Sequence, residues 1–409
     1  MNMSKWTRVL LSAGIVSLPA AMRADDATNA PAPPQPTVLT ALSSTTLSGY
    51  VDTSAVWKLG TGNANMPGRV YDGPDVQDGF NLNVVSLTLN KPLDDSPWAA
   101  GYNVQMLMGP GANKRGTGLG LGGPPVATDF SFNEAYVNLH VPVGNGLELH
   151  VGQFGTYNGY EAYDTYKNPN WSRSYGFFIE SSAHTGISAT YKVCDALTLQ
   201  GGIGNEAGFN NAVDVKATSE SRKAYLVMAT LTAPASMGFL KGATLSGGYT
   251  VGESLENLGG GVLGTWNQGN IYVGATAPLP VTGLSLGLAY DYTYGLPAAG
   301  TIADASSYAH ALAGYFMYQP TDKINLDLRL DWGQGSNGSF GYVNPSGNSD
   351  DLISTTATVG YSLWKNVISR LEFRWDHTLS GGTPFGGTTA GLGANKNAVS
   401  LTANIIYQF

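Results

Sequence analysis

The 409-residue sequence predicts an all-β protein, a transmembrane antiparallel up-and-down β-barrel of about 16 strands with short periplasmic turns and long extracellular loops. Three observations support this prediction: long segments in which apolar and polar residues alternate, connections that are alternately short and long, and charged faces that lipid would not tolerate. The composition agrees, because only 12% of the residues are charged, about half of the ~25% typical of soluble domains.

Residues 1–24 are interpreted as a secretory signal peptide, with Lys5 and Arg8 as its basic start. Its apolar run is about half of the ~20 residues that a membrane-spanning helix needs, which argues against an anchor. Residues 25–45 are rich in proline and are expected to form a periplasmic N-terminal tether. The barrel is therefore expected to span residues 46–409.

Sixteen segments show the period-two alternation of a β-strand. Most of them have 10 to 14 residues, which exceeds the ~5–6 of soluble sheets and suits the ~9–11 of a tilted membrane strand. They lie at 46–58, 80–91, 97–109, 129–141, 146–154, 183–193, 196–206, 222–234, 240–252, 266–277, 283–294, 306–319, 323–333, 351–362, 366–376 and 397–409.

The connections between these segments alternate in length. From the second segment onward every other connection has two to five residues, whereas the remaining ones have about eleven to twenty-eight. A barrel that is assembled through one membrane has short turns on one side and long loops on the other. A soluble sandwich has no comparable reason to sort its connections in this way.

Two segments, INLDLRLDW (324–332) and SRLEFRWDH (369–377), carry charges on one face and apolar residues on the other. An arginine that faces lipid at mid-depth costs roughly 2–4 kcal/mol, so three would consume an amount comparable to the ~5–15 kcal/mol that stabilises a domain. We therefore expect the charges to line the lumen, where they either set up a transverse field in the water or only tie strands together. This lumen-wall ladder comprises Asp327, Arg329, Asp331, Arg370, Glu372, Arg374 and Asp376.

The last seven residues, ANIIYQF, place Tyr407 and Phe409 on the apolar face of a closing strand. Such an ending resembles the assembly signal of Gram-negative outer-membrane barrels, which predicts that the barrel assembly machinery and outer-membrane lipid are partners. The alternative is an ordinary terminal strand.

Two stretches, LSGYVDTSAVWKLG (47–60) and 149–192 with its Gly-Tyr-Glu, Asn-Pro-Asn and Ser-Arg-Ser pieces, resemble the OmpL-like family of β-barrel porins, porin type 2. The resemblance implies a porin in the bacterial outer membrane with passive transport, and it supplies no catalytic motif. It leaves the solute open, so a general channel for small hydrophilic solutes and a substrate-selective channel both remain. A homotrimer is typical of the porins that the chain resembles.

The longest connection, 155–182, is the third long loop, which folds inward and narrows the channel in the general porins that this chain resembles. It carries four charged residues among several tyrosines, and we expect these four to form the pore constriction. The alternative is a loop exposed at the surface. The candidate constriction residues are Glu161, Asp164, Lys167 and Arg173.

Other functions find little support in the sequence. The formal charge of −8 becomes −11 without the signal peptide, which holds three basic residues and no acidic one, and this argues against nucleic acid as a partner. The single cysteine, Cys194, and the scattered histidines suggest no metal site and no cofactor. A barrel-based hydrolase would need a nucleophile with an oriented base, which is not recognisable here, and a surface adhesin remains a further alternative.

Overall fold

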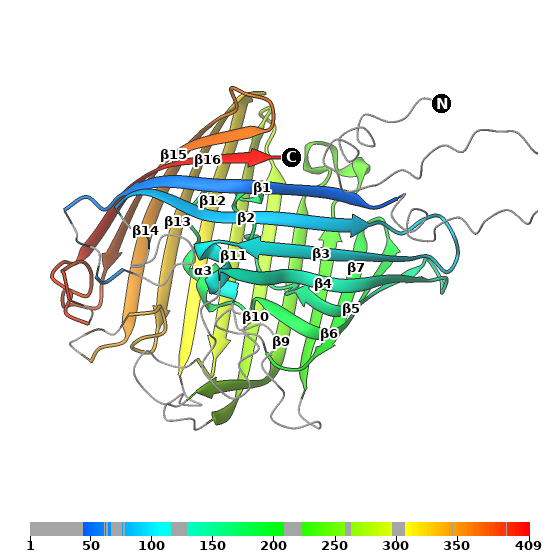
Figure 1. Cartoon of the computed structure of the whole chain (residues 1–409), viewed down its shortest axis with the longest axis horizontal. Helices are drawn as coiled ribbons and strands as arrows, with labels where there is room; N and C mark the ends of the chain where they lie inside the picture. Colours follow the sequence, from blue (N-terminus) through cyan, green and yellow to red (C-terminus); the bar gives the residue numbers. More distant parts are fainter. Residues whose placement is uncertain are drawn as a thin grey trace, which may run out of the picture. The chain divides into compact units, whose positions relative to one another are not determined.

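The computed structural model describes residues 44–409 except 61, 63, 67–75, 77, 116–128, 208–222, 258–262, 297–306, 343, 345–346 and 390. Within these residues sixteen antiparallel strands form a closed barrel, in which sequence neighbours pair and β1 pairs with β16 (Figure 1). The predicted fold class is confirmed. The predicted signal peptide (1–24) and all but the end of the predicted tether (25–45) lie outside the described residues.

The strands are listed here in chain order. They are β1 Thr46–Trp57, β2 Gly79–Lys91, β3 Ala100–Met108, β4 Phe130–Val141, β5 Leu147–Gly155, β6 Ala183–Cys194, β7 Leu197–Gly204, β8 Ala224–Thr232, β9 Thr244–Asn257, β10 Leu263–Pro278, β11 Leu284–Tyr294, β12 Tyr308–Thr321, β13 Ile324–Gly335, β14 Asp350–Tyr361, β15 Val367–Thr378 and β16 Asn397–Gln408. The helical segments are η1 Pro110–Arg115, η2 Thr165–Lys167, α3 Tyr175–Ile179 and η4 Ala235–Leu240. Among the described helices none has the length and apolar character that crossing a membrane requires.

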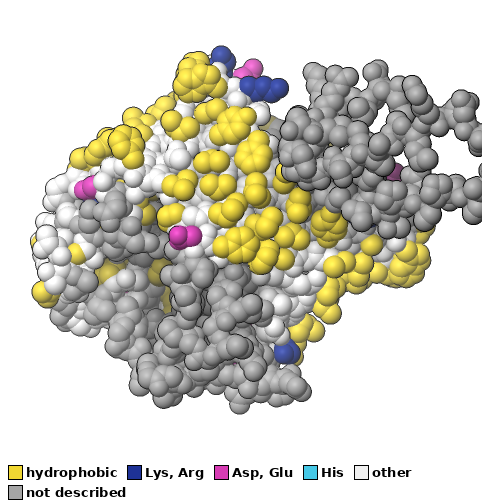
Figure 2. Space-filling model, viewed as in Figure 1, with side chains coloured by type: hydrophobic (Ala, Val, Ile, Leu, Met, Phe, Trp, Pro, Cys, Tyr) yellow, Lys and Arg dark blue, Asp and Glu magenta, His cyan; other side chains and the backbone are white. Residues whose placement is uncertain are grey.

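The two faces of each strand differ in the way that the sequence predicts. Leu328 and Phe373 are 38% and 43% exposed on the outside, whereas Arg329 and Arg374 on the inside are 0% and 1% exposed. Apolar side chains gather over the outer surface of the strands (Figure 2). Because charged groups avoid lipid, this surface is the one that contacts the membrane.

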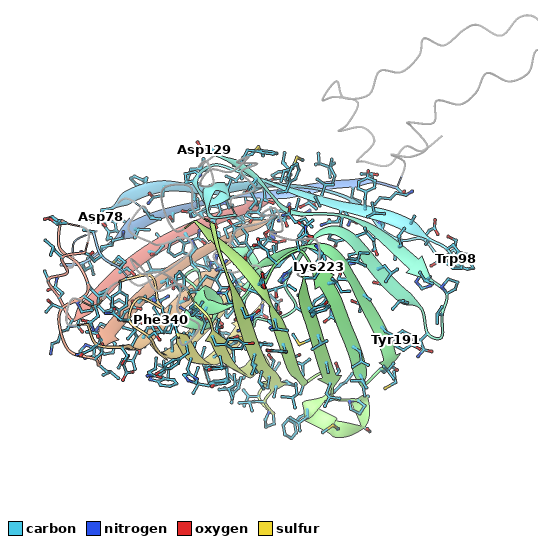
Figure 3. The ribbon with its side chains drawn as sticks, turned by 90° about the horizontal axis from the view of Figure 1, so that it is seen from below. Asp78, Trp98, Asp129, Tyr191, Lys223 and Phe340 are labelled. Carbon is cyan, nitrogen blue, oxygen red and sulfur yellow. The ribbon has the colours of Figure 1, made fainter. Side chains whose placement is uncertain are left out.

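The two ends of the barrel carry different connections. Trp98 and Tyr191 lie at the end with short turns, and Asp78 and Phe340 lie at the end with long loops (Figure 3). In bacterial barrels the short turns face the periplasm, so the long loops here face the cell exterior.

Two predicted connections are wrong. The expected short turn between the eighth and ninth strands is longer, because β8 ends at Thr232 before Pro234, which has no N–H to donate to a ladder, and η4 follows. The expected long loop after the ninth strand is shorter, because β9 and β10 continue to pair as far as Asn257 and Leu263. Ladder hydrogen bonds join backbone groups, so pairing continues beyond the end of the apolar alternation.

The barrel closes at the C-terminus. Phe409 and Gly49 exchange two backbone hydrogen bonds of 3.0 Å. A Cβ atom at Gly49 would lie 2.2 Å from the backbone oxygen of Ser86 and 2.7 Å from the Phe409 ring, so only glycine allows this close approach. Tyr407, which is exposed on the outside, stacks beside the Phe409 ring at 6.4 Å. The role of these two residues as an assembly signal stays a prediction.

Candidate functional site

The connection between β5 and β6, residues 156–182, runs through the interior of the barrel and is called the inner loop below. Its aromatic side chains pack against the inner face of the wall. Trp171 is fully buried in a cluster with Tyr50 and Ile406, and Tyr160 stacks on Tyr315 with ring centroids 4.3 Å apart. The short helix α3, which belongs to this loop, is seen among the strands of the barrel (Figure 1).

Small wall residues make room for the inner loop. Ala309 and Ala311 on β12 belong to the cluster that receives Tyr175 and Ile179 of α3. The helix begins at Tyr175 and is capped by Ser174, whose side chain accepts a hydrogen bond of 3.2 Å from the backbone N–H of Phe177. An N-cap of this kind satisfies a backbone donor that would otherwise be buried without a partner.

Glu161 lies at the centre of the contact between the inner loop and the wall. Its carboxylate forms a buried ion pair of 2.8 Å with Arg329 of β13, which also pairs with Asp331 at 2.8 Å. Its other oxygen accepts a hydrogen bond of 2.8 Å from the backbone N–H of Ser174. The predicted residues Glu161, Arg329 and Asp331 are therefore brought together, and water does not reach them.

Arg173 holds the inner loop in shape. Its guanidinium donates hydrogen bonds to the backbone oxygens of Trp171, at 2.9 Å, and Tyr163. It also lies over the Phe177 ring, 5.2 Å from the centroid, and is almost fully buried. Arg173, which was predicted to be a constriction residue, therefore stabilises the backbone of the inner loop.

The charges on β15 bind the backbone of the inner loop. Glu372 accepts hydrogen bonds from the backbone N–H groups of Trp171, at 2.6 Å, and Ser172, at 3.0 Å. Arg370 donates to the backbone oxygen of Thr165 at 3.0 Å and to Asn404 of β16 at 2.8 Å. Both side chains are buried. The negative Glu372 thus binds backbone N–H groups of the loop, and the positive Arg370 binds a backbone oxygen.

Arg374 and Asp376 form the other half of this contact on β15. Arg374 pairs with Asp376 at 2.9 Å and donates to the backbone oxygen of Arg173. Asp376 in turn accepts a hydrogen bond of 2.7 Å from the Tyr175 hydroxyl. Of the seven predicted ladder residues, only Asp327 is partly exposed; the other six are buried under the inner loop or beside it.

Asp164 and Lys167 lie on the other side of the inner loop. They form an ion pair of 2.8 Å in which the Lys167 side chain is 53% exposed and that of Asp164 is nearly covered. Asp164 also accepts hydrogen bonds of 2.9 Å from the Tyr50 hydroxyl and the Gln105 amide. Burial acts to lower the pKa of Lys167, but Asp164 outweighs it and the pKa is raised, so this lysine is charged.

Two cavities, each large enough for several water molecules, lie on this side of the inner loop. The one nearer the long loops has a volume of about 290 Å³, and the one nearer the short turns has about 310 Å³. The first reaches Glu180 and Ser182, and the second reaches Ser48 and Phe409. The residues that line both cavities, and therefore mark their junction, are Gln105, Glu134, Asp164 and Lys167.

Glu134 of β4 was not among the predicted site residues. It accepts a hydrogen bond of 3.0 Å from the Asn103 amide and is only half-buried. A register shift opposite Gln105 and Met106 turns Glu134 to the inner face. The sequence does contain a signal for this bulge, because the outward apolar positions change from even to odd numbers between Phe132 and Ala135.

A second carboxyl contact joins the end of the inner loop to the wall. Glu180 and Asp291 of β11 are hydrogen-bonded to each other and are both buried. Burial, followed by the proximity of Asp291, raises the pKa of Glu180 well above its usual range. A protonated Glu180 can donate to Asp291, and this removes the repulsion between the two carboxylates.

The described residues contain no group of three or more His, Cys, Asp or Glu side chains that could hold a metal ion.

Comparisons with known proteins agree with this architecture. Residues 44–409 match the family model described as "Putative beta-barrel porin-2, OmpL-like". A comparison with curated protein sequences gives no match.

Solved structures share the fold at low sequence identity. The outer membrane channel DcaP of Acinetobacter baumannii superposes with a TM-score of 0.58 at 12% identity, over 89% of this chain and 97% of that one. OprB of Pseudomonas putida gives 0.58 at 11% identity over 91% and 96%. The anion-selective porin from Comamonas acidovorans gives 0.56 at 13% identity over 90% and 99%.

The family match covers the whole barrel, and the fold of the barrel is that of outer-membrane channels. The chain therefore belongs to the OmpL-like family of β-barrel porins and is a porin of the bacterial outer membrane.

Proposed function

We propose that the barrel forms a water-filled channel for passive diffusion of small hydrophilic solutes, and that the inner loop (predicted as 155–182) is its constriction. The observation that carries this proposal is the path of the inner loop through the interior, with two cavities meeting at one side of it. A barrel of sixteen strands is too wide to be filled by its own wall side chains. An element that runs through the interior decides how much of that width remains open.

The wall contacts support a fixed loop rather than a loosely attached one. The inner loop is held by buried charges of both signs on β13 and β15, and breaking one such pair typically costs 3–5 kcal/mol. In this proposal the lumen-wall ladder holds the constriction in place. The solute passes beside the loop where the two cavities meet, next to Gln105 of β3 and Glu134 of β4.

The lining of this passage favours hydrophilic solutes. Amide side chains of Gln105, Asn103 and Asn133 line the cavities together with the charges of Glu134 and Lys167. Polar wall groups form hydrogen bonds that replace part of the hydration shell that a hydrophilic solute loses in a narrow passage. Apolar solutes cannot form these hydrogen bonds.

Chemical modification of Lys167 tests the proposal. In a Cys194→Ser background, Lys167→Cys is treated with a bulky methanethiosulfonate reagent during single-channel recording in a planar bilayer. We expect a stepwise fall in conductance, because position 167 lies where the cavities meet. The control is Leu328→Cys, whose side chain faces lipid and whose modification should leave conductance unchanged. Full modification at position 167 without any change in conductance would contradict a constriction at the inner loop.

A substrate-selective channel is the second candidate, and one observation favours it. Tyr136 and Tyr166 both line the cavity nearer the short turns, and the Tyr136 ring stacks on His150 at 4.1 Å. Aromatic faces of this kind bind flat apolar faces of solutes. A liposome flux that saturates with solute concentration would support selectivity, whereas a linear dependence would support a general channel.

Assembly as a homotrimer, contact with outer-membrane lipid and recognition by the barrel assembly machinery belong to the same proposal. The apolar side chains that gather on the outer face and the exposed Tyr407 and Phe409 support the lipid and assembly partners. Native mass spectrometry in detergent measures the oligomeric state directly, and a strictly monomeric species would exclude the trimer.

A further inference from the structure

A buried carboxylate lies at the seam where the first and last strands, β1 and β16, close the barrel (Figure 1). Asp52 of β1 is fully buried, and its Oδ1 accepts hydrogen bonds from the amide of Asn404 of β16, at 2.6 Å, and of Asn83 of β2, at 2.8 Å. Its Oδ2 accepts a hydrogen bond of 2.7 Å from the hydroxyl of Thr165 in the inner loop. One side chain of β1 thus joins both neighbouring strands and the inner loop.

Arg370 of β15 reaches the same segment of the loop from the other side of β16. It donates to the backbone oxygens of Thr165, at 3.0 Å, and Asn168, at 3.3 Å. It also donates to Oδ1 of Asn404, at 2.8 Å from Nη2 and 3.1 Å from Nε, while the amide nitrogen of Asn404 donates to Asp52. Asp52, Thr165, Arg370 and Asn404 therefore form a closed ring of hydrogen bonds across the seam, called the seam ring below.

The members of the seam ring depend on one another because water does not reach them. Their exposures are 0% for Asp52 and Thr165, 1% for Asn404 and 6% for Arg370. A buried polar group that loses its partner retains the cost of desolvation, and this cost is larger for a charged group. Removing one member of the ring therefore penalises the members that remain.

The wall next to the seam is adapted to this carboxylate. Asp52 pairs with Val84 and Thr53 pairs with Leu82, so Asn83 is the extra residue of a bulge in β2. A bulge changes the direction in which a side chain points, and here the Asn83 amide contacts Asp52. The bulge thus supplies a further donor to the carboxylate that binds the loop.

The seam ring also reaches the passage. Thr165 begins the short helix η2, which ends at Lys167, and Lys167 lines both cavities where they meet. A hydrogen bond that holds Thr165 therefore holds the backbone that carries Lys167.

We propose that Asp52 is a positioning residue for the constriction: it binds η2 to the seam, so that docking of the inner loop and closure of β1 against β16 stabilise each other. This inference rests on the proposed function, because it takes the inner loop to be the constriction. The coupling is reciprocal, since two equilibria that are linked affect each other by the same free energy. Weakening the loop contact loosens the seam, and weakening the seam releases the loop.

Thr165→Val tests the coupling from the side of the loop. The substitution keeps a branched side chain and leaves every strand residue in place, but Asp52 loses its donor from the loop. A hydrogen bond to a charged group is among the stronger ones, so we expect amide hydrogen exchange in β1 and β16 to accelerate by about tenfold in detergent micelles. Exchange in β8 and β9, which lie opposite the seam in the strand order, should stay unchanged.

Thr156→Val is the matched control. Thr156 belongs to the same loop, and its hydroxyl is hydrogen-bonded to the Ser181 hydroxyl within the loop at 2.8 Å. This variant loses the same group without touching the seam, so its exchange in β1 and β16 should equal that of the wild type. Equal acceleration in both variants would assign the effect to general loosening of the loop and overturn the role of the seam ring.

Single-channel recording of Asp52→Asn tests the positioning role itself. Loss of the charge weakens the contact with Thr165, so conductance and its noise should increase, which a purely structural role would not cause. In the double variant with Thr165→Val the increase should be no larger than in the stronger single variant, because both changes break one network. The control is Ser54→Ala in the same strand, whose hydroxyl donates to Asn83 within the wall and whose loss should leave conductance unchanged.

The outcomes separate this inference from the proposed function. Faster seam exchange in Thr165→Val together with higher conductance in Asp52→Asn supports it. Wild-type seam exchange in Thr165→Val would overturn the coupling and leave the proposed constriction intact, and wild-type conductance in Asp52→Asn would overturn the positioning role. Conductance that is insensitive to modification at position 167 would overturn the proposed constriction, and with it the positioning role, whatever the seam exchange.

Discussion

Replacing Arg329 with methionine is expected to release the inner loop from the wall. In the folded protein this guanidinium bridges Glu161 and Asp331 at 2.8 Å each and donates to the backbone oxygens of Ser172, at 2.6 Å, and Arg173, at 3.0 Å. Methionine preserves much of the volume but none of these interactions. Two buried carboxylates are then left without their main partner.

The magnitude follows from that arrangement. Removing one member of a buried ion pair typically costs 3–5 kcal/mol, because the remaining charge stays desolvated. Since every 1.4 kcal/mol is a factor of ten, the equilibrium constant for docking of the loop should fall by roughly two to three and a half orders of magnitude. Removing one of the two negative charges with Glu161→Gln in the same chain should recover part of this loss, because the two positions share one network.

Single-channel recording and urea unfolding in detergent micelles measure the two consequences. Arg329→Met should show a larger and noisier conductance and a free energy of unfolding that is lower by about 3–5 kcal/mol. The control is Lys365→Met at an exposed position of the last short turn, where a surface substitution changes stability by no more than about 0.5 kcal/mol. An Arg329→Met channel with wild-type conductance, noise and stability would refute the idea that buried charges hold the loop.

Two further predictions concern the outer face and the end of the inner loop. Leu328→Arg places a charge against lipid and should lower the free energy of unfolding in lipid vesicles by roughly 2–4 kcal/mol; unchanged stability would mean that Leu328 does not face the membrane. The pKa of Glu180 is raised by burial and by Asp291, so the folded state holds this proton more tightly than the unfolded state, and stability should fall as pH rises above about 4.3 toward the raised value. In Glu180→Gln the urea unfolding midpoint should depend less on pH over that range. An identical pH dependence in both proteins would exclude Glu180 as the cause of the stability loss.

Much of the fold could be predicted because a membrane barrel imposes two regularities on its sequence. Apolar and polar residues alternate along each strand, and short and long connections alternate between strands. Strand β13, Ile324–Gly335, alternates leucine with charge, and lipid leaves one orientation for it. The connections failed where local chemistry overrode the pattern: Pro234 ended β8 early, and β9 continued to Asn257 after its apolar alternation had stopped. Pattern reasoning follows side chains, whereas ladders are made by the backbone.

The site was less predictable, because burial depends on what covers a face. Alternation places Arg329 inside, but its partner Glu161 lies 168 residues earlier in the chain, and no local pattern relates the two. The prediction that residues near 161–173 and the wall charges belong to one region came from the resemblance to porins, which suggested an inward loop. Glu134 was missed for a different reason: a bulge in β4 breaks the alternation from which its face would be read.

The register across β13, β14 and β15 nevertheless contains information about the covering element. Arg329 and Arg374 both lie in the row of Thr356, and Asp331 and Asp376 both lie in the row of Ser354. Like charges that flank a small residue about 10 Å apart cannot satisfy one another across the row.

Each arginine instead pairs with the acid two residues further along its own strand, and its remaining donors need acceptors from an element placed above the wall. The inner loop does this: the backbone oxygen of Arg173 accepts from both Arg329 and Arg374, and the Tyr175 hydroxyl donates to Asp376. The donors that remain on Arg329 and Arg374 after these ion pairs are thus used by the inner loop. The same reasoning separates them from Glu134, which has an amide partner at 3.0 Å and retains its exposure to the channel water.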